Sequence, residues 1–275
     1  METVCYLQRK DIRILNTKFL AFDLEIEKEI PEGVTDWKEV APLGITCAAL
    51  LMSDYEKYGG YLLKFHNYDF SPISGAMDDD ELNALVDMLM EFRDDGYDIL
   101  TWNGLGFDLQ VLAQESGRFE DCSSLAIGHV DMMFHFLCRK GFPLGLNTAA
   151  TGLGLGGKTE GMKGDLAPIL WKPIREKLPK QFRYMPDVCL RWKVLEYVGQ
   201  DVVMTLEVAN TALSMGGLSW VSRSGRSNMF SLPKNAEGEH RWLTVKQALE
   251  LPEPDTSWMK NPMKRGDFLD WLVLK

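Results

Sequence analysis

The stretch KFLAFDLEI, residues 18–26, constrains the fold most, because its alternating apolar residues predict a β-strand. Alternate residues of a strand share a face. One face therefore carries Leu20, Phe22, Leu24 and Ile26, and the other carries Phe19, Ala21, Asp23 and Glu25. Burying two neighbouring carboxylates costs roughly several kcal/mol. An exposed sheet edge would explain the pair, and so would a divalent cation, which hard carboxylate oxygens bind well. This strand on its own favours the exposed edge.

The remaining sequence predicts a mixed α/β domain. Further strands are expected at residues 43–53, 60–67, 98–103 and 127–131. Helices are expected at residues 78–95, 107–116, 132–140 and 187–214. The last helix has a core face made of Val194, Val198, Val202 and Leu206.

We expect two parts in the chain, a main domain at residues 1–215 and an irregular C-terminal appendage of unknown role at residues 216–275. The appendage is rich in Gly, Ser and Pro, and only WLTVKQALE and RGDFLDWLV have helical patterns. Its SRSGR segment and four tryptophans suit substrate contact or docking, but simple packing on the main domain is the favoured interpretation.

Composition narrows the class of protein. Hydrophobic residues make up 45% of the 275 residues and charged residues 25%, as in ordinary soluble globular proteins. The net charge of −10 argues against non-specific coating of nucleic acid, although an enzyme that grips a few nucleotides needs only local positive charge. A basic region at residues 172–193 is most simply a solvated surface. The five scattered cysteines argue against a disulfide scaffold and a structural zinc site.

Targeting signals are not evident in the sequence. The longest apolar run, GITCAALLM, is too short to cross a bilayer, and the first residues lack the apolar core of a signal peptide. We therefore expect a cytoplasmic protein with no membrane partner.

The stretch TGLGLGGKTEG, residues 151–161, matches the phosphate-binding pattern G-x-x-x-x-G-K-[ST]. That pattern binds phosphate only between a buried strand and the start of a helix. Upstream, Leu146, Ala149 and Ala150 predict a short helix instead of a strand. Downstream, two glycines and Pro168 would break a helix within two turns. Both flanks argue against nucleotide binding.

Two other regions place acids where the fold does not need them. Asp108 follows the strand and glycine turn of LTWNGLGFDLQVL, where a helix N-cap is its ordinary explanation. Tyr197 and Asp201 are four residues apart, so they lie beside each other on one helical face. Valines flank both, which predicts a buried Asp that needs an explanation. A metal site would account for all four acids at once.

These three motifs resemble those of the DEDD superfamily of 3′–5′ exonucleases. The chain has D-x-E on the first strand, N-G-x-x-F-D at the middle strand-to-helix turn and Y-x-x-x-D on a late helix. The tyrosine is typical of the DEDDy branch, which includes the proofreading domains of family B DNA polymerases. The resemblance covers about residues 15–215 and implies an RNase H-like mixed β-sheet flanked by α-helices. LNTAATGLGLGGK also resembles a family segment, which makes residues 152–159 a helix end and a loop.

The resemblance implies a site for two divalent metal ions, Mg²⁺ or Mn²⁺. Asp23 would bridge the ions, and Glu25 and Asp201 would complete the site of the ion that activates water. Asp108 would hold the second ion through water, near the leaving oxygen. Tyr197 would orient the attacking water. Two ions about 3.5–4 Å apart stabilise the attacking and leaving oxygens of an in-line displacement.

Three residues are expected to contact the substrate. Asn103 matches a family position near the sugar or phosphate of the substrate. Lys158 and Lys163 lie on the glycine-rich loop before the last helix, where we expect them to contact phosphates. Where this chain has Ile26 the family often has Thr or Ser, a departure that affects a substrate contact and not the metal site.

The histidines serve as a control for the tyrosine. The sister branch of the superfamily uses a His four or five residues before the last Asp, and this chain has none there. We therefore expect structural or surface roles for His66, His129, His135 and His240.

Two functions are compatible with these residues. The first is a metal-dependent 3′–5′ exonuclease that acts on the 3′ end of single-stranded nucleic acid, DNA favoured over RNA, and releases nucleoside 5′-monophosphates. The second is a nucleic-acid-binding or scaffolding module of the same fold with little or no turnover. The presence of all four acids and the tyrosine favours the enzyme. A proofreading role would require a polymerase or repair partner, because these 275 residues contain no polymerase domain.

Overall fold

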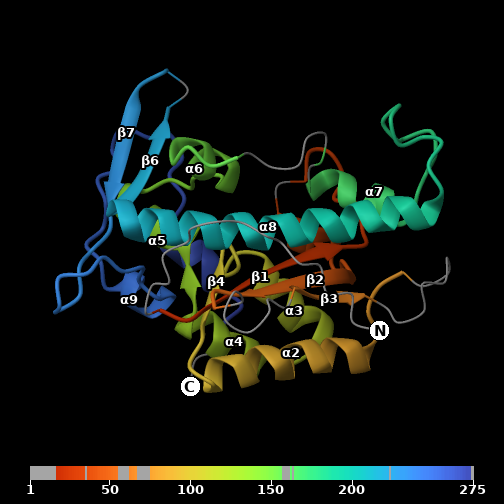
Figure 1. Cartoon of the computed structure of the whole chain (residues 1–275), viewed down its shortest axis with the longest axis horizontal. Coiled ribbons are helices and arrows are strands. Elements are labelled where there is room, and N and C mark those ends of the chain that lie inside the picture. Colours follow the sequence, from red (N-terminus) through yellow and green to blue (C-terminus); the bar gives the residue numbers. More distant parts are fainter. Residues whose placement is uncertain are drawn as a thin grey trace.

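The computed structural model describes residues 17–34, 36–54, 62–66, 75–156, 162, 164–222 and 224–273, with the backbone only for residues 62–66. Five strands in this part of the chain form one mixed sheet in the order β3-β2-β1-β4-β5 (Figure 1). They are β1 Phe19–Ile26, β2 Ile45–Met52, β3 Leu62–His66, β4 Asp98–Thr101 and β5 Val130–Asp131. β1 pairs antiparallel with β2 and parallel with β4. The predicted mixed α/β fold and its strands are confirmed.

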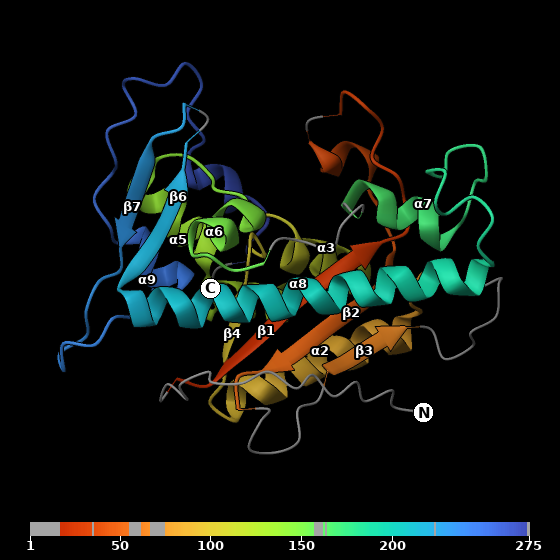
Figure 2. The ribbon, with the colours of Figure 1, turned by 45° about the horizontal axis from the view of Figure 1, so that its top comes forward.

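Helices cover both faces of the sheet (Figures 1 and 2). One face packs against α2 Asp79–Asp94, α3 Asp108–Ser116 and α4 Phe119–Gly128. The other packs against α6 Leu146–Gly152, α7 Ala167–Trp171 and α8 Asp187–Met215. The helix α5 Met132–Lys140 follows β5, and Asp131 caps it by accepting a hydrogen bond from the backbone N–H of Phe134.

β1 is the central strand of the sheet, so the expectation of an exposed edge is wrong. Its predicted alternation is confirmed, because Leu20 and Phe22 are buried on the α2–α4 side while Phe19 and Ala21 are buried on the α8 side. Asp23 and Glu25 therefore share the α8 side. β2 pairs with the strand from Leu20 to Ile26 and β4 pairs with it at Phe19–Ala21, so β1 lies inside the sheet, and an exposed sheet edge does not explain the buried Glu25.

The helix α8 runs the length of the domain, across β1, β2 and β4 (Figure 2). Its predicted face is buried, and it consists of Val194, Val198, Val202 and Leu206. The helix ends at Gly216, which has φ 81°, a left-handed conformation that glycine adopts at little cost. None of the described helices combines the length and the apolar composition that crossing a lipid bilayer would require.

Two helices, α4 and α7, were not predicted. α4 contains two adjacent serines, and one of them, Ser123, lies on its buried face, so its helical period is weak. α7 contains Pro168, which sequence reasoning treated as a helix breaker. Pro168 instead lies in the first turn, where the missing N–H breaks no hydrogen bond.

The part of the chain after Gly216 forms a hairpin that the sequence did not predict. β6 Gly217–Val221 pairs antiparallel with β7 Ser227–Ser231. Farther along, the first helical pattern forms α9 Val245–Leu249, and the second forms only the 3₁₀ turn η3 Arg265–Phe268. Tryptophans tie this part to the main body, because Trp242 donates to the carbonyl of Ala209 and Trp271 to that of Leu105.

The glycine-rich stretch follows a helix, as predicted, and not a strand. α6 ends at Gly152, where a Cβ atom would lie 1.8 Å from the backbone oxygen of Ser219 in β6. Gly152 is therefore explained by the close approach of α6 and β6. Gly157, Lys158 and Thr159 of the phosphate-binding pattern lie outside the described residues.

Candidate active site

Three carboxylates meet between the centre of the sheet and α8. Ligand atoms of Asp23, Glu25 and Asp201 all lie within 4.8 Å of one another. The β1–β2 register places small residues beside the two strand acids, since Asp23 pairs with Ala49 and Glu25 with Cys47. These small neighbours leave space for the carboxylates under α8. Glu25 and Asp201 are buried, at 6% and 5% exposed, and Asp23 is half-buried.

Tyr197 lies one helical turn before Asp201 and is 2% exposed. Its hydroxyl donates a hydrogen bond to the carboxylate of Asp201. Burial raises the pKa of Tyr197 far above its usual value, and the negative charges of Asp201, Glu25 and Asp23 raise it further. The phenol therefore stays protonated and is a neutral hydrogen-bond donor beside the three acids.

Asp108 is the first residue of α3 and is 4% exposed. Its Oδ1 accepts a hydrogen bond from the backbone N–H of Leu24, at 3.2 Å, which joins it to β1. Burial raises the pKa of Asp108 to about 7, with smaller upward contributions from Asp131 and Asp201, against the lowering effect of the backbone hydrogen bonds. Asp108 lies outside the group of three acids but close enough to feel the charge of Asp201.

The loop between β4 and α3 is held by Asp131, a role that the sequence reasoning missed. One oxygen of Asp131 accepts from the N–H of Asn103 and the other from the N–H of Leu105, both at 3.0 Å. Asn103 has φ 76°, a left-handed conformation that Asn tolerates better than most residues. The position of Asp131 between a short strand and a helix accounts only for a helix cap. That it also binds the loop depends on the neighbouring positions of β4 and β5.

The acids open onto a cleft of about 500 Å³. The cleft is within the usual size range of small-molecule sites. Asn103 and all five residues predicted to be catalytic line it, namely Asp23, Glu25, Asp108, Tyr197 and Asp201. Sequence reasoning did not predict the other walls, which include Glu29, Trp102, Phe107, Asp165, Pro168 and Ile169. The cleft thus combines an acidic floor with aromatic and apolar sides.

Comparison with known proteins places the chain in a family. A family model described as the RNase H superfamily matches residues 61–213, more than half of the chain. The chain belongs to the RNase H superfamily. No curated protein matches it. Membership indicates a nuclease-type hydrolytic activity and nucleic acid as the class of ligand.

The RNase H superfamily match contains two of the three motifs. It runs from β3 to α8, and so includes Asp108, Tyr197 and Asp201. It begins after β1, which carries Asp23 and Glu25. The tertiary structure brings these two acids to the others, because β1 lies between β2 and β4 and under α8.

The acidic group fits the divalent metal ions that RNase H-like nucleases typically use. Carboxylate oxygens are the ligands that Mg²⁺ and Mn²⁺ prefer. Three carboxylates within 4.8 Å repel one another unless a cation or protons neutralise them. Asp23, Glu25 and Asp201 would therefore hold a divalent ion, and Asp108 lines the same cleft.

The structure describes the basic region at residues 172–193 but not the two lysines that are expected to contact phosphates. Lys158 and Lys163 lie outside the described residues. In the basic region, Lys172 pairs with Glu27 at 2.5 Å and Lys177 with Glu29 at 2.8 Å. The acids that follow β1 therefore neutralise part of this basic surface near the cleft.

Proposed function

We propose that this RNase H-like protein is a metal-dependent 3′–5′ exonuclease. Its substrate would be the 3′ end of single-stranded nucleic acid, DNA favoured over RNA, and its products nucleoside 5′-monophosphates. The observation that carries the proposal is the buried Tyr197–Asp201 pair beside Asp23 and Glu25 in one cleft. This is the arrangement that the resemblance to the DEDDy branch implies, and an RNase H-like fold is compatible with it.

Each residue would have a distinct role. Asp23, Glu25 and Asp201 would hold the metal ions, with Asp108 contributing to the second site. When bound, the ions would activate a water molecule and stabilise the charge that develops on the phosphate. The protonated hydroxyl of Tyr197 would orient that water, because its hydrogen bond to Asp201 fixes its direction.

The walls of the cleft support a nucleotide as the occupant. Trp102 and Phe107 provide aromatic side chains of the kind on which bases stack, and Ile169 adds apolar surface. Asn103 also lines the cleft, where its amide can contact a sugar or phosphate. A cleft of about 500 Å³ suits the end of a strand.

The test uses single-stranded DNA and RNA oligonucleotides, each labelled at the 5′ or the 3′ end, with Mg²⁺, Mn²⁺ or EDTA. We expect a ladder of shortened products from the 5′ label, immediate release of a labelled mononucleotide from the 3′ label, and no products in EDTA. Asp201→Asn should lower the rate by about three orders of magnitude, because metal ligation contributes several kcal/mol to transition-state stabilisation.

Asp187→Asn is the matched control for this experiment. It makes the same substitution in the same helix, at a partly exposed residue that pairs with Arg175 and does not line the cleft. We expect it to retain full activity. Unchanged oligonucleotide in both metals, with binding retained, would favour a catalytically weak binding or scaffolding module. A ladder that persists in Asp201→Asn would show that the acids are wrongly assigned.

A further inference from the structure

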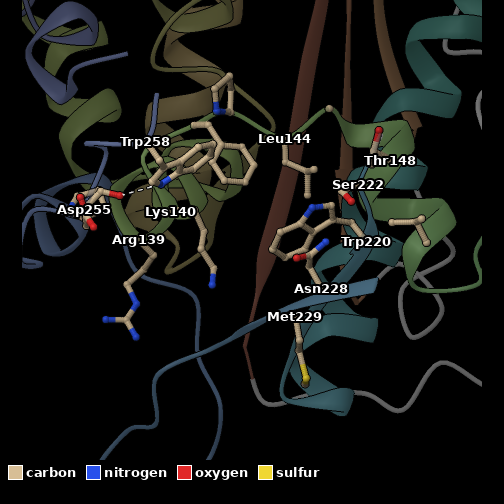
Figure 3. Close-up of a pocket in the computed structure, with 15 residues that line it drawn as sticks. Arg139, Lys140, Leu144, Thr148, Trp220, Ser222, Asn228, Met229, Asp255 and Trp258 are labelled. Carbon is tan, nitrogen blue, oxygen red and sulfur yellow. Dashed lines mark hydrogen bonds between the residues drawn. The ribbon is translucent and has the colours of Figure 1, made fainter. Parts of the chain in front are cut away.

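A second and larger cavity, of about 910 Å³, lies where α5, the β6–β7 hairpin and the segment 254–258 meet (Figure 3). We call it the appendage groove. Its lining residues are Arg139, Lys140, Phe142, Pro143, Leu144, Gly145, Thr148, Trp220, Val221, Ser222, Asn228, Met229, Pro254, Asp255 and Trp258. It shares none of these residues with the catalytic cleft.

Trp258 is exposed yet held in place. Its side chain is 68% exposed, whereas Trp220, Trp242 and Trp271 of the same part of the chain are buried. Its indole N–H donates to the backbone oxygen of Asp255 at 3.1 Å, and its ring contacts the edge of Phe142, with centroids 6.1 Å apart. A large aromatic ring that is both exposed and fixed is suited to stacking, because little side-chain freedom is lost on binding.

The opposite wall is also aromatic (Figure 3). Trp220 on β6 packs against Phe136 and Phe142, with ring centroids 5.1 Å and 6.3 Å apart. The ammonium group of Lys140 lies 5.9 Å from the centroid of the Trp220 ring. This second wall of the appendage groove is therefore a packed aromatic surface with a cation beside it.

Two cations flank these rings. Arg139 and Lys140 end α5, and neither forms an ion pair with an acidic residue in the described part of the chain. Asp255 is the acidic residue of the lining, and its carboxylate accepts from the N–H of Ser257 within its own turn. A cationic wall in a chain of net charge −10 is suited to an anionic ligand.

The appendage groove adjoins the catalytic cleft. Trp102 lines the cleft, and its indole N–H donates to the backbone oxygen of Leu144 at 2.9 Å. Leu144 lines the appendage groove. One hydrogen-bonded pair of residues thus links the walls of the two cavities, so the two cavities are neighbours in the fold.

We propose that the appendage groove binds the part of a single-stranded nucleic acid that lies 5′ of the nucleotide being removed. Bases would stack on Trp258, and phosphates would contact Arg139 and Lys140. The alternation of aromatic rings and cations matches the two repeating chemistries of a single strand, bases and phosphates. This inference rests on the proposed function for the polarity of the strand, but not for the binding itself.

The test measures dissociation constants in EDTA, so that no cleavage takes place, for fluorescent oligothymidylate and oligouridylate of about twelve nucleotides. Trp258→Ala should weaken binding about 5- to 150-fold, the effect of losing one stacked base. The logarithm of the association constant falls linearly with the logarithm of the salt concentration. Arg139→Ala and Lys140→Ala should each make this slope shallower by about 0.7, the value for one phosphate contact. The DNA and RNA arms show which nucleic acid the groove prefers.

Matched variants on the other face of the sheet control for exposure and charge. Phe119→Ala removes an exposed aromatic ring from α4, and Arg93→Ala removes one positive charge from α2. Both should leave the affinity and the salt slope unchanged. A dinucleotide, which fills only the catalytic cleft, should bind the Trp258→Ala and unaltered proteins equally.

The two proposals fail in different ways. If Trp258→Ala and both cation variants bind the longer oligonucleotides with unchanged affinity and salt slope, or the unaltered protein does not bind them, the appendage groove proposal is wrong. If those effects are present but the unaltered protein cleaves nothing in Mg²⁺ or Mn²⁺, the groove proposal stands and the exonuclease proposal falls.

Discussion

The carboxylate of Asp108 accepts a hydrogen bond from the backbone N–H of Leu24, a residue 84 positions earlier in the sequence. Leu24 lies between Asp23 and Glu25 on β1, so this bond fixes the acid of α3 relative to the acids of the strand. It forms because β4 pairs with β1 only as far as Ala21. Beyond that point the side chain of Asp108 takes the place of a strand partner.

Because Asp108 is buried, the effect of Asp108→Asn on the melting temperature should depend on pH. The pKa of Asp108 is raised from 3.8 to about 7, mainly by burial. The folded state holds the proton of Asp108 more tightly than the unfolded state does. The contribution of the protonated Asp108 carboxyl to the free energy of unfolding is therefore complete below pH of about 4 and is lost as pH rises through about 7. In EDTA, Asp108→Asn should therefore melt at a higher temperature than the unaltered protein at pH 8, and at a similar temperature at pH 4. Equal melting temperatures at pH 8 would contradict the raised pKa.

Tyr197→Phe should separate positioning of water from metal binding. The substitution removes the hydroxyl that donates to Asp201 but keeps the buried ring. We expect single-turnover cleavage to slow by about 10- to 100-fold, the cost of a slightly misplaced reactant. The rise in melting temperature on adding Mn²⁺ should persist, because the acids remain. Tyr184→Phe is the control, since Tyr184 is 92% exposed. Full activity in Tyr197→Phe would exclude the proposed role.

Asp131→Ala should destabilise the loop that carries Asp108. The substitution removes the carboxylate that accepts from the N–H groups of Asn103 and Leu105. It also removes the cap of α5, in which the same carboxylate accepts from the N–H of Phe134. The two loop N–H groups cost about 1–3 kcal/mol each when left without acceptors and the lost cap costs about 1 kcal/mol, so we expect a total loss of about 3–7 kcal/mol in urea unfolding. Asp78→Ala removes only the cap of α2 and should cost about 1 kcal/mol. Equal losses in the two variants would show that Asp131 acts only as a cap.

Gly152→Ala tests the structural explanation of the glycine-rich stretch. The new Cβ atom would overlap the backbone of β6 at Ser219, so the variant should lose about 1–3 kcal/mol or more of stability in urea unfolding. Gly156→Ala is the matched control, because no atom lies within 4 Å of its Cβ position and its φ is not left-handed. It should be neutral or stabilise the fold by a few tenths of a kcal/mol. A stable Gly152→Ala variant would contradict the close packing of α6 on β6.

Sequence periodicity predicted the main elements because it reflects local backbone geometry. The alternation in β1 placed Asp23 and Glu25 on one face, and the helical period of α8 placed Tyr197 beside Asp201. Each relationship depends only on the rise and turn of one element. The same reasoning failed at α7, where a proline in the first turn was taken for a helix breaker.

Only the tertiary structure determined which strands, helices and loops are neighbours. That β1 is central, that Asp108 bonds to Leu24 and that Asp131 holds a loop from another strand all follow from which strands neighbour each other. The hairpin and the exposure of Trp258 likewise depend on contacts between distant segments. A sequence pattern records the period of each element, whereas packing between elements is set by the whole buried surface. The sequence by itself therefore determined the acids, the tyrosine and the elements that carry them, and the tertiary structure assembled them into one cleft.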